Sequence, residues 1–176
     1  QKALGACRRA TRIDPLSAEA WKVMGWTSLG LDLLDEAAEA FRAATKLSSD
    51  DPDARAGLAA VRMRDGDLEG AESILSPLVE SGMATPCVAA GFADLRARQG
   101  RAEEAISVVA DLVERPLAAS ERISLAFALG DLWEVTGRPE PAMAAWTHAN
   151  ALCNSDFDPE LHRSRVDKLI STCLLY

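Results

Sequence analysis

Small and large apolar residues recur at a fixed distance along this chain. An Ala that has an acidic or polar residue one or two positions before it is found at positions 3, 37, 71, 105 and 142, and an apolar residue stands four positions after each. Those partners are Cys7, Phe41, Leu75, Val109 and Trp146. The steps between the alanines are 34, 34, 34 and 37 residues. Successive steps of equal length indicate an internal structural repeat.

Each period contains a second small residue and a turn residue, so we predict two helices in every unit. The second small residues are Gly25, Ala59, Ala93 and Gly130, and the turn residues are Asp32, Gly66, Gly100 and Gly137. Small residues let two helix backbones approach closely while larger apolar residues fill the space around them. The pattern therefore predicts a series of antiparallel helix pairs.

Helix starts are marked by residues that cap or pre-organise a first turn. Ser17 precedes a predicted helix from Ala18, and the next helix is predicted from about Asp35 to Leu47. Asp51-Pro52 and Thr85-Pro86 each combine a capping side chain with a proline where no backbone donor is lost. The fourth unit is predicted to start near Ser120, with three extra residues in the loop before it.

These residues resemble the tetratricopeptide repeat (TPR) family, whose unit of about 34 residues reads W-x2-L-G-x2-Y and then A-x3-F. The first full unit has Trp21, Met24 and Gly25, followed by Ala37 and Phe41. The fourth unit has Leu129, Gly130, Trp133, Ala142, Trp146 and Ala149. The resemblance implies an all-α, right-handed solenoid of antiparallel helix pairs. We expect half a unit over residues 1–16, four units over 17–153, and a loop with a C-terminal capping helix over 154–176.

Two further expectations concern the ends of the chain. Ala3 falls in the second helix of its unit, so we expect this sequence to be a fragment of a larger protein. Residues 157–162 and 165–170 resemble the segment that follows the last repeat in bacterial TPR proteins with a sulfotransferase domain. That resemblance implies a catalytic domain further on, and it assigns no catalytic residue here.

Composition and charge narrow the function classes. The net charge is −8 and the pI about 4.8, a sign that repels nucleic-acid phosphates. No apolar run is long enough to span a membrane. The four cysteines, at 7, 87, 153 and 173, show no metal-ligand spacing, so we interpret them as packing residues in a cytoplasmic protein. That spacing also predicts no metal site. We expect no enzyme activity, because acidic pairs such as Glu103-Glu104 stand at helix starts, where they meet the helix dipole, and no cofactor, because the sequence has no Gly-rich phosphate loop.

The candidate site is the concave groove that the first helices of successive TPR units line. Its predicted exposed positions are Lys22, Trp26, Ala56, Ala60, Met63, Ala90, Asp94, Arg98, Phe127, Asp131 and Glu134. Trp26 lies off the core positions, so it is either a binding anchor or a packing surface for helices upstream. Some TPR proteins hold peptide C-terminal carboxylates with Lys and Asn, but Trp26 and Ala60 occupy positions that would require Asn.

The sequence thus predicts a helical-repeat scaffold that binds a protein, a peptide or another domain of the same polypeptide. The alternative is the regulatory or substrate-recruiting region of a bacterial sulfotransferase. Neither nucleic acid nor a membrane is an expected partner.

Overall fold

The computed structural model describes residues 2–153, which form α-helices joined by short turns, without a strand in that range. The helices are α1 (Lys2–Ile13), α2 (Ala18–Gly30), α3 (Leu34–Leu47), α4 (Pro52–Arg64), α5 (Leu68–Glu80), α6 (Pro86–Arg98), α7 (Glu103–Val113), α8 (Ala119–Val135) and α9 (Pro139–Leu152). The predicted capping helix lies outside the described residues. The chain is an all-α helical-repeat solenoid.

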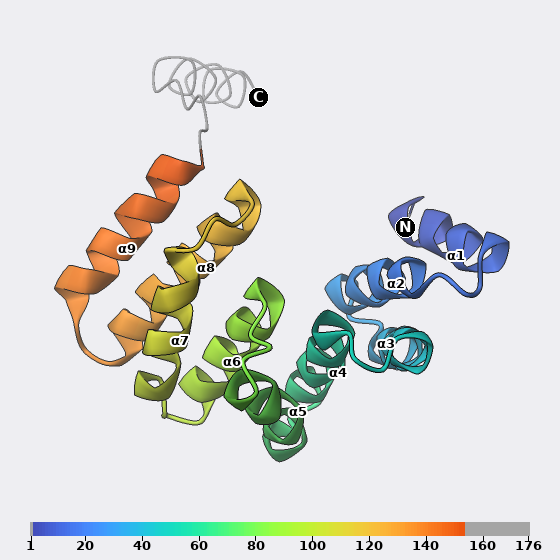
Figure 1. The fold of residues 1–176 in the computed structure, drawn as a ribbon, viewed down its shortest axis with the longest axis horizontal. Coiled ribbons are helices and arrows are strands. Elements are labelled where there is room, and N and C mark those ends of the chain that lie inside the picture. The colour runs from blue at the N-terminus through green and yellow to red at the C-terminus, as the bar shows by residue number, and fades with distance from the viewer. Residues whose placement is uncertain (1, 154–176) are drawn as a thin grey trace, which may run out of the picture.

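The helices pair in sequence as α2/α3, α4/α5, α6/α7 and α8/α9, and successive pairs stack side by side along an arc (Figure 1). The first helices of the pairs also contact one another: α2 touches α4, α4 touches α6, and α6 touches α8. Because each pair covers the apolar face of its neighbour, the core runs along the array instead of closing into a globule. These four pairs extend from Ala18 to Leu152.

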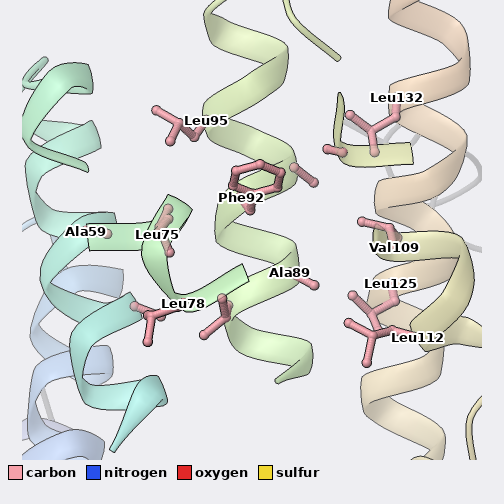
Figure 2. Packing of buried hydrophobic residues seen from close by; sticks show 14 of the residues in the cluster. Ala59, Leu75, Leu78, Ala89, Phe92, Leu95, Val109, Leu112, Leu125 and Leu132 are labelled. Atoms are coloured by element: carbon pink, nitrogen blue, oxygen red, sulfur yellow. The ribbon is translucent and has the colours of Figure 1, made fainter. Parts of the chain in front are cut away.

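The repeat alanines mark the closest helix contacts, as predicted for the full units. Ala37, Ala71, Ala105 and Ala142 are fully buried. The small residues on the facing helices are also needed for close packing. A Cβ on Gly25, for example, would lie only 2.7 Å from the Phe41 ring. Figure 2 shows how Leu75, Phe92, Val109 and Leu125 fill the space between neighbouring pairs.

Each turn between paired helices reverses through a left-handed residue. Gly66, Gly100 and Gly137 have φ of 86°, 70° and 73°, and Asp32 takes the same place at 61°. Asp32 is the sole non-glycine residue with positive φ in the described range. The prediction that Asp32 takes the place of the turn glycine in the first unit is therefore confirmed. Asp tolerates this left-handed conformation better than most residues.

The predicted helix starts are confirmed by hydrogen bonds. Ser17 accepts from the Ala20 amide, Asp51 from the Asp53 and Ala54 amides, and Thr85 from the Val88 amide. The fourth unit begins at Ala119, one residue before the prediction, and the Glu121 carboxylate accepts from the Ala118 amide at 3.0 Å.

One core prediction is wrong and three others are met in part. Ala3 is exposed, because α1 packs on α2 and meets α3 at Cys7 and Arg8, which leaves Ala3 uncovered. Trp21, Trp133 and Trp146 stand at repeat positions that predict core packing; all three are half-buried, and Trp21 and Trp133 pack against the core clusters. The indole nitrogens explain two of them: Trp21 Nε1 donates to the Pro15 carbonyl at 2.9 Å, and Trp146 Nε1 donates to Asp131 at 3.0 Å. These polar atoms hold the ring edges near the surface.

The cysteines also differ from one another. Cys7 is buried, Cys87 is half-buried and Cys153 is exposed, while Cys173 lies outside the described residues. A packing role therefore fits Cys7 and Cys87 but not Cys153.

Candidate functional site: the groove along the first helices

Three open hollows lie along the first helices of the pairs, and we call this surface the groove. The first hollow, about 280 Å³, lies between Trp26 and Leu29 of α2, Met63 and Arg64 of α4, and Asp94 and Arg98 of α6. The second, about 290 Å³, lies between Asp94 and Ala97 of α6 and Asp131, Leu132 and Val135 of α8. The third, about 340 Å³, includes Trp26, Cys87, Ala90, Glu121 and Ser124.

Trp26 borders both the first and the third hollow. Its side chain is 39% exposed, and its ring meets Phe41 edge-on, with centroids 5.1 Å apart and planes at 75°. Phe41 is fully buried, so one edge of Trp26 is held by the core while the rest stays open to the groove. The hollows beside Trp26 are formed with α4, α6 and α8, not with α1.

Lys22 is engaged within the protein. Its ammonium lies 2.8 Å from Glu19 and 2.9 Å from Asp51, and its side chain is only 17% exposed. The hydrogen bond to Glu19, together with Asp51, raises the pKa of Lys22 against the opposing effect of burial. Lys22 therefore joins α2 to the start of α4, and its charge is matched before any ligand arrives.

Asp94 and Arg98 form an ion pair at the boundary between the first and second hollows. Arg98 Nε lies 2.8 Å from Asp94, one turn earlier on α6, and both side chains are about half-exposed. The hydrogen bond to Asp94 raises the pKa of Arg98. The pair adds no net charge to the groove.

Ala56 and Met63 depart from the predicted exposed positions. They are 2% and 4% exposed and belong to the main core cluster, because α5 and α6 pack against α4. Met63 still contributes a wall to the first hollow. Ala60 and Ala90, both half-buried, line the hollows as small residues that leave room for a ligand.

The predicted residues of α8 separate into two groups. Asp131 borders the second hollow, where its carboxylate also accepts from Trp146. Phe127 is half-buried and Glu134 is exposed, and neither borders any of the three hollows. The structure therefore brings Trp26, Met63, Asp94, Arg98 and Asp131 to the hollows.

Sequence reasoning missed two groove residues that the repeat could have identified. Arg64 borders the first hollow and stands 34 residues before Arg98, the equivalent position of the following unit. Cys87 borders the third hollow, and burial raises the pKa of its thiol to about 12. A thiol with that pKa stays protonated at neutral pH, so it is a packing group and not a nucleophile.

The described residues contain no cluster of three or more His, Cys, Asp or Glu side chains placed to hold a metal ion. Over the same range, every helix is too short or too polar to traverse a lipid bilayer.

Comparisons with known proteins agree with this geometry. A family model described as tetratricopeptide repeat matches residues 28–86, from the end of α2 to the start of α6. No curated protein sequence matches the chain. A thermophilic TPR protein from Thermus thermophilus has a similar structure, with a TM-score of 0.71, 20% identity, and coverage of 95% of this chain and 89% of that one.

Two further solved structures share the fold. A TPR protein from Parabacteroides merdae has a TM-score of 0.71 and 20% identity over 88% of this chain and 59% of its own. YrrB, described as a TPR protein with an unusual peptide-binding site, has a TM-score of 0.56 and 20% identity over 93% and 82%. The class of protein is thus an α-helical-repeat protein. The matched model and these structures support the TPR family in particular, and neither points to an enzyme family.

Proposed function

We propose that the groove binds a segment of a partner protein, or of another domain of the same polypeptide, with Trp26 as its main anchor. The observation that carries the proposal is an aromatic ring that is 39% exposed between two hollows. Trp is enriched among the residues that dominate binding energy, and this ring borders two hollows instead of lying on a flat surface. The described peptide-binding site of YrrB supports the same class of ligand.

The test is a selection of short random peptides displayed on phage against the whole chain, followed by affinity measurements. Trp26→Ala is expected to weaken binding of the selected peptides by at least about tenfold, the range of a single anchor residue. Met143→Ala on α9, 59% exposed and outside the three hollows, is the control and is expected to change little. Circular dichroism establishes that both variants fold. Peptides that bind Trp26→Ala as tightly as the native chain would refute the anchor.

A second candidate function is substrate recruitment for a bacterial sulfotransferase. This function is supported by the resemblance of residues 157–170, which lie outside the described residues. The gene sequence after Tyr176 tests the proposal. A strand followed by a phosphate-binding loop there would support it, and further TPR units would oppose it. We also propose a bacterial, cytoplasmic protein that binds neither nucleic acid nor membranes, consistent with its net charge of −8.

A further inference from the structure

We infer that the bound segment carries a bulky apolar residue beside an acidic side chain, with a basic residue further along. The apolar side chain enters the first hollow, its acidic neighbour pairs with Arg64, and the basic residue lies beside Asp131 at the second hollow. This inference rests on the proposed function, because it names the chemistry of the segment that the groove would bind.

The first hollow carries one uncompensated positive charge. Arg98 is neutralised by Asp94 at 2.8 Å, whereas Arg64 forms no ion pair within the described part of the chain. Arg64 is exposed at the last position of α4, where its guanidinium can turn toward a ligand. A positive hollow stands out in a chain of net charge −8, and it favours a carboxylate.

The walls of the first hollow require an apolar side chain next to that carboxylate. Trp26, Leu29 and Met63 supply aromatic, aliphatic and thioether surface around about 280 Å³. A guanidinium beside such a surface binds a carboxylate most strongly when an apolar neighbour excludes water from the pair.

The second hollow has the opposite charge. Asp131 borders it, Glu134 is exposed one turn further along α8, and α8 has no basic residue in its last turn. By contrast, α4 and α6 end with arginines that offset the negative carbonyl ends of their helices. The carbonyl end of α8 thus adds to the carboxylate charge, and a cation of the partner offsets both.

The carboxylate is assigned to a side chain within the segment and not to a chain end. The first hollow shares Asp94 with the second and Trp26 with the third, so a segment seated in the first hollow can continue into a neighbouring one. The other basic groove residue, Lys22, is already held by Glu19 and Asp51. Opposite charges at the two hollows also fix the direction in which the segment lies.

The experiment repeats the display selection with random peptides that have no free C-terminus, on the native chain and on Arg64→Glu. On the native chain, the Trp26-dependent peptides are expected to place Asp or Glu beside an aromatic or aliphatic residue. On Arg64→Glu, Lys or Arg is expected at that place instead. Binding of the native-selected peptides should weaken about tenfold in Arg64→Glu and regain strength as salt masks the repulsion.

Arg42→Glu is the matched control, because Arg42 is exposed on α3 and lies outside the three hollows. Reversing its charge changes the net charge of the protein by the same amount as Arg64→Glu. Arg64→Gln adds a milder variant, and circular dichroism checks that each one folds. Trp26-dependent peptides without an acidic preference, or with equal affinity for Arg64→Glu and Arg42→Glu, would overturn this inference alone. An absence of any Trp26-dependent peptide would instead overturn the proposed function.

Discussion

Phe41 is held between glycines from two helices that belong to successive units. A Cβ on Gly25 of α2 would lie 2.7 Å from its ring, and a Cβ on Gly57 of α4 would overlap the same ring. Phe41 is fully buried and also supports Trp26 edge-on. The two glycines therefore let one aromatic ring join two helix pairs and hold the proposed anchor.

Gly57→Ala is expected to destabilise the protein by roughly 1–3 kcal/mol, the usual cost of overpacking a core. Gly91 occupies the equivalent position 34 residues later, but a Cβ there would lie 3.6 Å from Leu75, an ordinary contact. Gly91→Ala is therefore expected to stabilise α6 by up to about 1 kcal/mol through helix propensity. Urea unfolding of the two variants measures both effects.

A double variant checks the cause of the Gly57→Ala loss. Phe41→Leu in the Gly57→Ala background should recover part of the stability, because the smaller side chain removes the overlap. Equal effects of Gly57→Ala and Gly91→Ala would show that the Phe41 ring does not limit the space at Gly57.

At the scale of helices, a nearly buried arginine joins three of them. Arg96 of α6 is 4% exposed and lies 2.5 Å from Glu72 of α5 and 3.2 Å from Glu104 of α7. Its guanidinium also covers the Phe92 ring at 4.6 Å. Arg101 reaches Glu72 at 3.0 Å as well, so the carboxylate of Glu72 has two cationic partners.

This network makes stability depend on pH in the acid range. Hydrogen bonds from Arg96, Gln99 and Arg101 lower the pKa of Glu72 from its ordinary 4.5 to about 2. Because the folded pKa is the lower one, Glu72 stabilises the fold above pH 4.5 and this contribution is lost as the pH falls toward 2. Glu72→Gln is expected to reduce the loss of thermal stability across that window.

Glu80→Gln is the control for the pH experiment, since Glu80 is exposed on the same helix and forms no ion pair in the described part of the chain. The melting temperatures of the native chain and of both variants are measured across that pH window, and the size of the decrease is compared. A native-like pH profile for Glu72→Gln would contradict the role of this network.

The helices and turns could be predicted from the sequence because the repeat encodes them locally. Ser17, Asp32 and Ala71 act through contacts within their own helix pair, and the spacing reveals them. Burial of Met63 could not be predicted, because it depends on how closely α6 lies beside α4. The pairing of Lys22 with Asp51 also depends on this stacking, since Asp51 belongs to the following unit.

The groove was predicted in outline but not in its chemistry. Trp26 could be identified because it stands outside the repeated core positions, whereas Arg64 was missed although Arg98 occupies the same place one unit later. Pairing of charges across helices decides which of these residues remain open to a ligand. That property depends on side-chain geometry, which the repeat pattern does not contain.

At the scale of the whole molecule, the first helix of each pair lies along the groove and the second helix lies away from it. The three hollows are bordered by α2, α4, α6 and α8, while α3, α5, α7 and α9 contribute no wall to them. The pairs succeed one another along the arc of Figure 1, so a bound segment can contact several units at once. We propose that partners bind on this face.

Site-specific photo-crosslinking tests that claim most directly. A benzophenone amino acid is placed singly at Val135 and Ser124 in the groove, and at Arg42 of α3 and Met143 of α9 away from it. Each variant is irradiated with the selected peptides and the adducts are quantified by mass spectrometry. Strong adducts are expected from the two groove positions and weak ones from the other two. Strong adducts from Arg42 or Met143, with none from Val135 and Ser124, would contradict binding on this face.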